Sequence, residues 1–274
     1  MGKIVGIDIG GSTTKIIGLD GGKLFSPILV KATDPIASLY GALGRFLSDN
    51  ALELSQVERL MVTGVGAAFI EKSILNIPTT KVNEFQSIGN GGLWLTGLDR
   101  AIIVSMGTGT AFVVANGEKV THLGGTGVGG GTLLGLSNRM LNIRNFDDIV
   151  ELAKSGELNH VDLSIGDMTA GELVGMPPDT TASNFGKLSD MATPADMALG
   201  IINLVFQTIG MLSVFASRTE KIPDVVLTGN LTNVPQIGVV FGKLSELFNV
   251  KFHIPETAEY ATAAGAAILG LYNG

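Results

Sequence analysis

The sequence repeats one plan, and this repeat constrains the fold more than any other feature. Three short strands with a glycine-rich first turn open the chain, and alternating helices and strands follow them. The same order begins again near residue 99, after a helix that starts near Glu84. The strands expected in the two copies cover residues 3–9, 13–19 and 23–30, and residues 101–105, 110–115 and 118–122. Two such units that face each other enclose a cleft between them.

Turn and helix-start signals set the bounds of the other elements. Asp20-Gly21 and Asn116-Gly117 are hairpin signals, and Asp34-Pro35 and Thr193-Pro194 mark helix starts. Further helices are expected at residues 35–49, 67–75, 131–142, 146–155, 194–218, 235–248 and 257–272, and further strands at residues 59–63, 79–82, 224–228 and 250–253. Residues 159–191 form a long polar segment outside the plan, and a loop of this length is usually functional or mobile.

Composition excludes several classes of protein. The 18 basic and 25 acidic residues give a net charge of −7, which argues against a globally basic nucleic-acid binder. The chain has no cysteine, so it has no disulfide framework, no cysteine-ligated zinc or iron–sulfur site and no cysteine nucleophile. Glycine, at 38 of 274 residues, is about twice its usual share, which indicates tight turns and close approach of the backbone to a ligand.

One apolar segment has the length of a membrane span. Residues 197–216 contain no charged side chain. Asn203, Gln207 and Ser213 interrupt the segment, so we interpret it as a buried helix or a helix–helix interface. The first residues lack the apolar core of a signal peptide. We therefore expect a cytoplasmic protein with neither a membrane nor a nucleic acid as partner.

The first glycine-rich turn has the residues of a phosphate-binding bend. Glycine lets backbone N–H groups approach phosphate oxygens, hydroxyl groups add donors, and lysine adds a cation. An aspartate at the end of a buried strand needs a positive partner, and Mg²⁺ takes oxygen ligands of this kind. The residues expected to bind nucleotide here are Asp8, Gly10, Gly11, Ser12, Thr13 and Lys15, with Asp8 also as the metal ligand.

Two later turns complete the predicted nucleotide site. The second copy repeats the bend at Gly107, Thr108 and Gly109, so that two bends would hold a phosphate chain from both sides. Gly229 and Asn230 follow a buried strand, at a place where open α/β folds bind ligands, and are expected to hold the adenosine. The small residues 261–267 form a helix suited to close helix packing between two hinging lobes.

These motifs, in this order, resemble those of the superfamily of sugar and acetate kinases, 70-kDa heat-shock ATPases and actin, over nearly the whole chain. Within it, the chain is most similar to the type II (eukaryotic-like) pantothenate kinases. The matching residues are Asp8-Ile9-Gly10-Gly11-Ser12-Thr13, Asn83-Glu84-Phe85, Gly107-Thr108-Gly109, Gly124-Gly125-Thr126-Gly127-Val128-Gly129-Gly130-Gly131-Thr132 and Ala182-Ser183-Asn184-Phe185-Gly186.

The resemblance implies an α/β fold of two duplicated ribonuclease-H-like lobes, the actin-like ATPase fold, with an ATP cleft between the lobes. The N-terminal lobe is expected at residues 1–98 and the C-terminal lobe at residues 99–256. The last helix, residues 257–274, is a candidate to pack back on the N-terminal lobe. Gly129, Gly130 and Gly131 open a helix and are expected to face the nucleotide, because a helix N-terminus attracts phosphate.

Glu84 is the candidate general base. Transfer of a phosphoryl group from ATP to an alcohol needs a group that accepts the hydroxyl proton and orients the oxygen. A carboxylate after a strand and at a helix start would point into the cleft, and the resembled family carries its catalytic glutamate in this place. The alternative is an acidic residue that stabilises the first turn of its helix through the helix dipole.

The resemblance also implies pantothenate as the substrate, held by Thr110, His122, Gly124, Gly125, Thr126, Ser183 and Phe185. Two positions depart from the family pattern. His122 stands where the family has an arginine that holds the pantothenate carboxylate, and Ala111 stands in place of a hydroxyl residue. Neutral histidine binds a carboxylate far more weakly than a bidentate arginine does. The substrate is therefore bound more weakly, or through Arg139 or Arg144, or is not pantothenate.

Residues 167–186 resemble the family's loop that encloses substrate or an acyl-CoA regulator across a dimer. The apolar helix over residues 195–215 resembles the family's dimer helix, which implies a homodimer. A core helix in a monomer is the alternative.

Three other functions are compatible with parts of the pattern. A kinase for a sugar or another small alcohol would account for His122. An actin-like or chaperone-like ATPase would use the same nucleotide cleft without transferring phosphate to an alcohol. An ATPase that activates a radical dehydratase requires iron–sulfur ligands, and the absence of cysteine excludes it.

Overall fold

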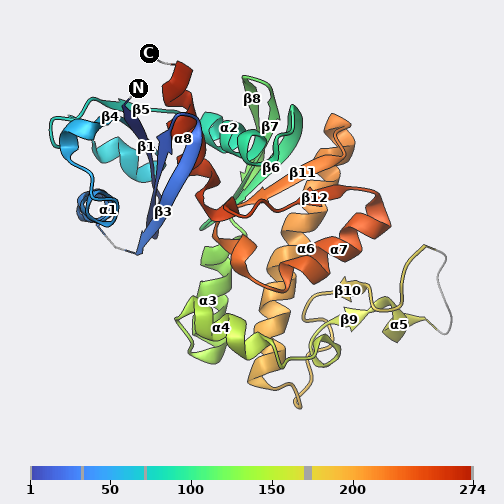
Figure 1. Cartoon of the computed structure of the whole chain (residues 1–274). Coiled ribbons are helices and arrows are strands. Elements are labelled where there is room, and N and C mark those ends of the chain that lie inside the picture. The colour runs from blue at the N-terminus through green and yellow to red at the C-terminus, as the bar shows by residue number, and fades with distance from the viewer. Residues whose placement is uncertain (1, 32–33, 71–72, 170–174, 273–274) are drawn as a thin grey trace.

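Two five-stranded sheets with the same strand order form the centre of the molecule (Figure 1). The computed structural model describes residues 2–31, 34–70, 73–169 and 175–272. The first sheet has the order β3-β2-β1-β4-β5, and the second has the order β8-β7-β6-β11-β12. Their strands are β1 (Lys3–Ile9), β2 (Thr13–Asp20), β3 (Lys23–Lys31), β4 (Val57–Thr63) and β5 (Thr79–Lys81), and β6 (Arg100–Met106), β7 (Thr110–Asn116), β8 (Lys119–Thr126), β11 (Asp224–Thr228) and β12 (Lys251–His253).

Strand pairing repeats in the two sheets. The central strand pairs antiparallel with the strand that follows it, as in Ile7 with Ile16 of the first sheet and Ile103 with Val113 of the second. It pairs parallel with a strand from farther along the chain, β4 in the first sheet and β11 in the second. This repeated mixed sheet confirms the duplicated α/β fold.

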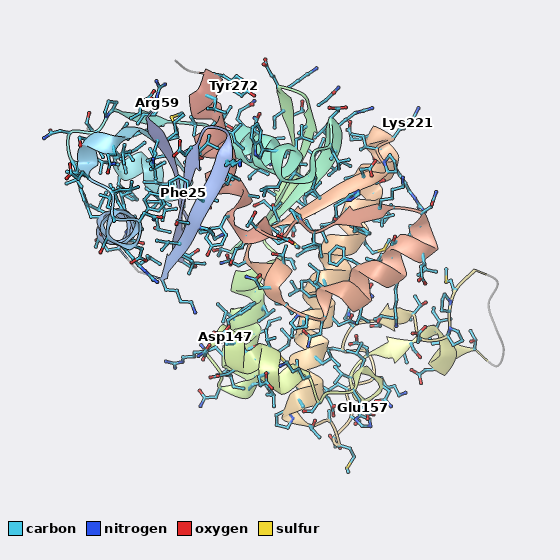
Figure 2. The ribbon with its side chains drawn as sticks, in the orientation of Figure 1. Phe25, Arg59, Asp147, Glu157, Lys221 and Tyr272 are labelled. Atoms are coloured by element: carbon cyan, nitrogen blue, oxygen red, sulfur yellow. The ribbon has the colours of Figure 1, made fainter. Side chains whose placement is uncertain are left out.

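Helices cover the outer faces of the sheets. Leu39, Leu43 and Phe46 of α1 (Pro35–Asp49) pack on the first sheet, and Phe25, labelled in Figure 2, lies 5.6 Å from Phe46 between ring centroids. The long helix α6 (Pro194–Glu220) packs on the second sheet. The other elements in this half of the chain are α3 (Gly130–Leu141), α4 (Phe146–Ala153), α5 (Ile165–Met168), α7 (Ile237–Phe248), β9 (Leu163–Ser164) and β10 (Thr181–Ser183).

Two local predictions were wrong. The helix expected at residues 67–75 is a short 3₁₀ turn, Val65–Phe69, followed by a bridge between Ile74 and Ile77; residues 71 and 72 lie outside the described residues. Strand β8 continues past residue 122 to Thr126, because an extra residue at Leu123 forms a bulge that lets pairing resume at Gly124.

Helix α6 is the one helix in the described part of the chain that is long and apolar enough to cross a membrane. Its apolar window is 61% buried inside the protein. Ile201, Val205 and Phe206 are fully buried in the core of the second lobe.

Helices α2 (Glu84–Thr96) and α8 (Ala261–Tyr272) each pack on the sheet of the opposite half of the chain (Figure 1). Ile88 and Leu93 of α2 share a core with Ile103 of the second sheet. Ala267 of α8 shares a core with Ile4 of the first sheet. The division of the chain at residue 98 stays a prediction. Helix α2 precedes residue 98 in the chain, whereas the strands of the sheet that it covers all follow that residue.

Helices α2 and α8 also contact each other through their backbones. A Cβ added at Gly265 would lie 1.8 Å from the carbonyl oxygen of Ser87, and one added at Gly91 would lie 1.9 Å from that of Ala261. Only glycine permits this approach, because any side chain would have to separate the helices.

We expect Gly265→Ala to lower the free energy of unfolding by about 1–3 kcal/mol, the usual cost of overpacking a core. Urea-induced unfolding followed by circular dichroism measures this change. Gly44→Ala is the matched control, because Gly44 lies in α1 with no atom near its missing Cβ. That control should be neutral or stabilise by up to about 1 kcal/mol. Equal stability of the two variants would contradict the backbone contact.

Candidate active site

The first bend joins β1 to β2 and carries one charge of each sign. Gly10 N donates a hydrogen bond to Thr13 O at 3.0 Å, which closes the bend. Asp8 and Lys15 lie opposite each other on the two strands. The Lys15 side chain is only 6% exposed, and in the described part of the chain it forms no hydrogen bond or ion pair. A buried lysine amine without a hydrogen-bond acceptor indicates a site for an anion.

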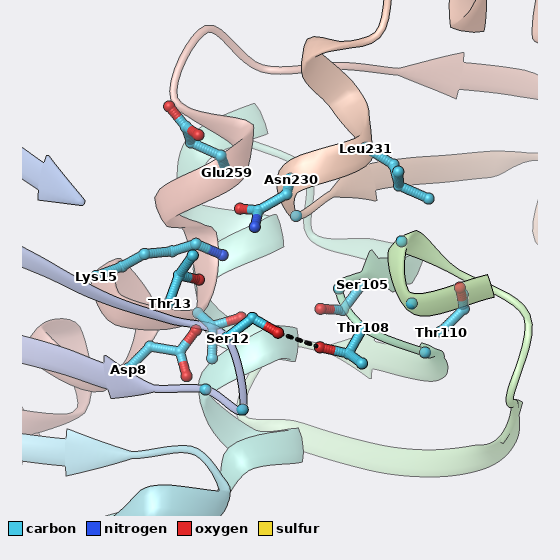
Figure 3. A pocket seen from close by; sticks show the side chains of 18 of the residues that line it. Asp8, Ser12, Thr13, Lys15, Ser105, Thr108, Thr110, Asn230, Leu231 and Glu259 are labelled. Carbon is cyan, nitrogen blue, oxygen red and sulfur yellow. Dashed lines mark hydrogen bonds between the residues drawn. The ribbon is translucent and has the colours of Figure 1, made fainter. Parts of the chain in front are cut away.

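The second bend joins β6 to β7 and meets the first. Ser12 Oγ lies 3.4 Å from Thr108 Oγ1, as the dashed line in Figure 3 shows. Gly107 N donates to Gly109 O at 2.9 Å and closes the second bend. The two bends were predicted to act together although Ser12 and Thr108 are 96 residues apart in the chain. They face the same space.

The first turn of α3 docks on the second bend. Gly130 N donates to Gly107 O and Gly131 N donates to Thr108 O, both at 2.9 Å, while Gly129 N donates to Thr132 Oγ1 at 3.3 Å. These N–H groups are therefore already paired within the protein. The three glycines hold the second bend in place, and direct contact of their N–H groups with phosphate stays a prediction.

The third turn lies on the same side of the space as α8. Gly229 N donates to Ala258 O at 3.0 Å, which joins this turn to the segment before α8. Among the described residues, nothing donates a hydrogen bond to the buried Asn230 Oδ1. Figure 3 shows the Lys15 amine directed toward Asn230. An acceptor without a donor at this position indicates that a ligand supplies one.

All three turns line one cavity of about 1200 Å³. The predicted site residues on its wall are Asp8, Gly10, Gly11, Ser12, Thr13, Lys15, Glu84, Gly107, Thr108, Gly109, Thr110, Gly125, Thr126, Gly130, Gly131, Gly229 and Asn230. They come from both sheets and their turns, from α2 and from the start of α3, so the cavity lies between the two halves of the chain.

Two carboxyl groups in the cavity have perturbed acidities. Burial raises the pKa of Asp8, and the positive charge of Lys15 opposes part of that rise. Burial also raises the pKa of Glu84, and the negative charge of Asp8 adds to the rise. Carboxyl groups that repel each other in a partly buried site are suited to a hard cation at one and to proton transfer at the other.

Comparisons with known proteins identify the family of this chain. The model of the Fumble family matches residues 100–245, which is more than half of the chain. The chain belongs to the Fumble family. The match covers the second bend, α3 and α6, and it ends before α8.

Two relatives, both named type II pantothenate kinase, align with almost the whole of this chain. A type II pantothenate kinase of Bacillus cereus (strain G9842) is 26% identical over 259 residues, which cover 91% of this chain and 92% of that protein. A type II pantothenate kinase of Staphylococcus aureus (strain MRSA252) is 28% identical over an alignment of 277 residues, covering 97% and 99%.

Among solved structures, the activator of the 2-hydroxyisocaproyl-CoA dehydratase from Clostridium difficile, with bound ADPNP, gives a TM-score of 0.72. It is 15% identical and covers 99% of this chain and 95% of that one. At this identity the likeness concerns the fold alone, and it confirms the predicted actin-like ATPase fold.

Two residues predicted to bind substrate lie on β8 beside the cavity but not on its wall. His122 is exposed and stacks on Phe85, with 3.8 Å between ring centroids. Gly124 follows the bulge at Leu123 and has a positive φ of 140°. Their contact with a substrate stays a prediction.

Two others, Ser183 and Phe185, lie away from the cavity near α6. Buried Asp162 accepts hydrogen bonds from Phe185 N at 2.8 Å and from Asn203 Nδ2 of α6 at 2.6 Å. Phe185 also packs against the core of the second lobe. In this chain these contacts hold the segment between α4 and α6 to the second lobe, and contact of Ser183 and Phe185 with a ligand stays a prediction.

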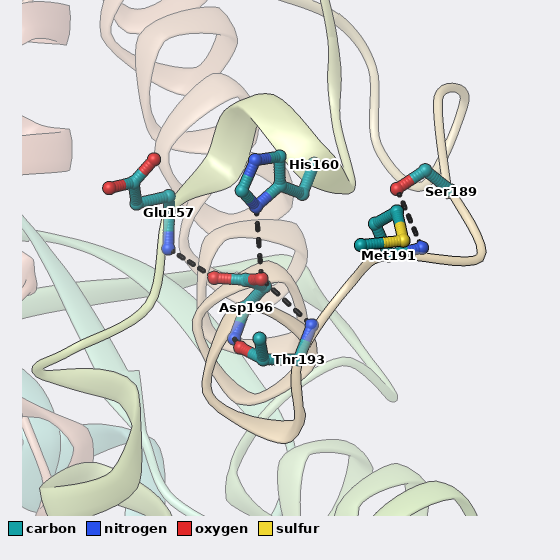
Figure 4. A network of polar contacts seen from close by, with 6 residues as sticks. All are labelled: Glu157, His160, Ser189, Met191, Thr193 and Asp196. Carbon is teal, nitrogen blue, oxygen red and sulfur yellow. Dashed lines mark hydrogen bonds and ion pairs between the residues drawn. The ribbon is translucent and has the colours of Figure 1, made fainter.

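A second polar network fixes the other end of this segment (Figure 4). Asp196 accepts hydrogen bonds from Glu157 N at 2.6 Å and from Thr193 N at 2.8 Å, and it lies 3.1 Å from His160 Nδ1. Burial acts to raise the pKa of Asp196, but these hydrogen bonds prevail and hold it well below its usual range. The carboxylate thus caps α6 and fastens the preceding loop to it.

The cavity wall also includes polar residues that the sequence did not indicate. Lys31 lies opposite Thr13 in the β2–β3 pair, so the register of the three strands would have revealed it. Glu259 accepts a hydrogen bond from Asn233 Nδ2 at 2.8 Å, and both residues line the cavity. No local motif marks this pair, because the two residues are 26 positions apart.

Proposed function

We propose that this protein is a pantothenate kinase, which transfers the γ-phosphoryl group of ATP to the primary alcohol of pantothenate and forms 4′-phosphopantothenate. This reaction is the first step of coenzyme A biosynthesis. The observation that carries the proposal is the meeting of the two bends at Ser12 and Thr108, in one cavity with the Glu84 carboxylate. Membership of the Fumble family and the kinases of Bacillus and Staphylococcus support the choice of substrate.

The nucleotide occupies the cavity between the bends. The Lys15 amine and the hydroxyls of Ser12, Thr13 and Thr108 contact its phosphates, and the turn at Asn230 holds its adenosine. The structural neighbour that contains ADPNP supports an adenine nucleotide as ligand.

Magnesium fits the corner at Asp8. In phosphoryl-transfer enzymes Mg²⁺ is usually held by one or two carboxylates together with phosphate oxygens and water. Among the described residues, no group of three or more His, Asp or Glu side chains could hold a metal by itself. Asp8 would hold the ion jointly with the nucleotide, and the ion would neutralise charge on the phosphates.

Glu84 accepts the proton of the alcohol. As the alcohol oxygen bonds to the γ-phosphorus and the bond to the ADP oxygen breaks, the hydroxyl proton passes to the Glu84 carboxylate. Its raised pKa makes it a stronger base than an exposed glutamate. The bends and Lys15 supply the positioning and charge neutralisation that lower most of the barrier.

One observation favours a second acceptor class, a sugar or another small alcohol. His122 stacks on Phe85 instead of lining the cavity, so β8 brings no cation to the wall. Of the two arginines that could replace it, Arg144 lines the cavity and Arg139 does not.

Turnover over a panel of acceptors tests the substrate. ADP release with pantothenate, hexoses, amino sugars and glycerol, each with and without acetyl-CoA, gives a kcat/KM for every acceptor, and mass spectrometry identifies the product. We expect pantothenate to have the highest value, because the family relatives bear that name. A higher value for a sugar would overturn the choice of substrate, and inhibition by acetyl-CoA would support the acyl-CoA regulator that the family resemblance implies.

We expect Glu84→Gln to lower turnover by about 10²–10⁴-fold, as loss of a general base does, and to leave ATP affinity nearly unchanged. A base acts when ionised, so wild-type kcat/KM should fall as the pH drops through the raised pKa of Glu84, above the ordinary value of 4.5. Steady-state kinetics and calorimetric ATP titration measure both effects. Glu118→Gln, on an exposed hairpin, is the control, and near-normal turnover of Glu84→Gln would exclude Glu84 from the mechanism.

We further propose a homodimer formed through α6. Leu212 and Phe215 of this apolar helix are 36% and 53% exposed, and a second copy would cover them. We expect Phe215→Asp to yield a monomer in sedimentation-velocity runs, because the new charge would be buried without a partner. Tyr40→Asp, at an exposed aromatic residue of α1, should leave the mass unchanged. A monomeric wild type would contradict this assembly.

A further inference from the structure

Within the described residues, no side-chain or backbone group orients the Glu84 carboxylate. In the described part of the chain nothing donates a hydrogen bond to it or forms an ion pair with it. Its direction therefore depends on the backbone at the start of α2. There Asn83 caps the helix by accepting a hydrogen bond from Gln86 N at 3.1 Å, and Ser87 Oγ donates to Asn83 O at 3.0 Å.

The residue next to Glu84 is held by the other lobe. The rings of Phe85 and His122 are nearly parallel, at 13°, with 3.8 Å between their centroids. Phe85 lies in the first turn of α2, and His122 lies on β8 of the second sheet. Stacked rings at this distance attract each other beyond the apolar area that they bury.

The spacing of helix and strand produces this stack. Val120 fills the space at Gly89, where an added Cβ would lie 2.5 Å from Val120 Cγ2. Residues four apart in a helix are separated by about 6 Å along its axis, and residues two apart in a strand by about 6.6 Å. Contact between Gly89 and Val120 therefore brings Phe85 against His122. The bulge at Leu123 follows at once, so that Gly125 and Thr126 can line the cavity.

We infer that His122 is a positioning residue for the Glu84 carboxylate and acts through its stack on Phe85. The stack ties the start of α2 to β8, which pairs with β7 directly after the second bend. The base is thereby fixed relative to the half of the phosphate site that the second lobe supplies. This inference rests on the proposed function only in taking Glu84 as the base.

Three variants test the role. His122→Ala removes the ring, His122→Phe retains a ring that can stack, and Thr121→Ala changes an exposed neighbour in the same strand. We expect kcat of His122→Ala to fall about threefold to tenfold, the scale of one aromatic contact, with the KM for the acceptor unchanged. His122→Phe and Thr121→Ala should both keep wild-type kcat.

Amide hydrogen exchange of residues 84–88 gives a readout that needs no acceptor. Exchange there should be faster in His122→Ala than in wild type, and unchanged in His122→Phe and Thr121→Ala. Because His122 is exposed, these variants should fold, and thermal unfolding checks this. If the wild type transfers nothing to pantothenate, the proposed function fails while the exchange experiment still decides the inference.

Other outcomes would overturn the inference. A raised KM with normal kcat in both His122 variants would make the imidazole a substrate contact. Normal kcat in His122→Ala would remove any role in positioning. A lower kcat with unchanged exchange at residues 84–88 would show that His122 does not act through the start of α2.

Discussion

The crossing of α2 and α8 determines how the two halves of the chain meet. Their backbones touch at Gly91 and Gly265, a separation that no other residue allows. Each helix lies on the sheet of the opposite half, so the two sheets are held side by side across this contact. The glycine-rich bends both leave their sheets at the end of the central strand. Fixing the sheets in this way is what brings Ser12 within 3.4 Å of Thr108.

The charges in the cavity are arranged for a ligand that carries both signs. Among the described residues, nothing accepts a hydrogen bond from the buried Lys15 amine. Burial raises the pKa of Asp8 although the charge of Lys15 opposes the rise, and burial together with the charge of Asp8 raises the pKa of Glu84. Each of these buried groups costs free energy in the folded protein. A polyphosphate with a divalent cation would relieve both conditions, because the phosphate oxygens would face Lys15 and Asp8 would hold the cation. In the proposed function Glu84 would then accept the proton of the alcohol.

Local sequence signals predicted the strands and turns that depend on neighbouring residues. Local signals did not predict the features that depend on packing between distant parts of the chain. The three-strand units and their bends were predicted because a glycine-rich turn between alternating apolar residues specifies a hairpin over a few residues. The packing of α8 on the first sheet, which the family resemblance implied, depends on contacts between residues far apart in the chain, such as Gly6 and Ala263, so periodicity alone does not reveal it. His122 was assigned to the substrate by position in a motif, but the close approach at Gly89 turns its ring onto Phe85. Glu259 was missed because its partner is distant in the chain.

Likeness of fold and likeness of chemistry diverge in this protein. The dehydratase activator shares the two-lobed architecture over nearly the full chain, but only 15% of the residues are identical, so this likeness concerns the fold alone. Phosphoryl transfer needs backbone amides, hydroxyls, a lysine and carboxylates in one cavity. All of these line the space between the bends. The fold therefore sets where a nucleotide can bind, and the identity of a few wall residues decides which reaction follows.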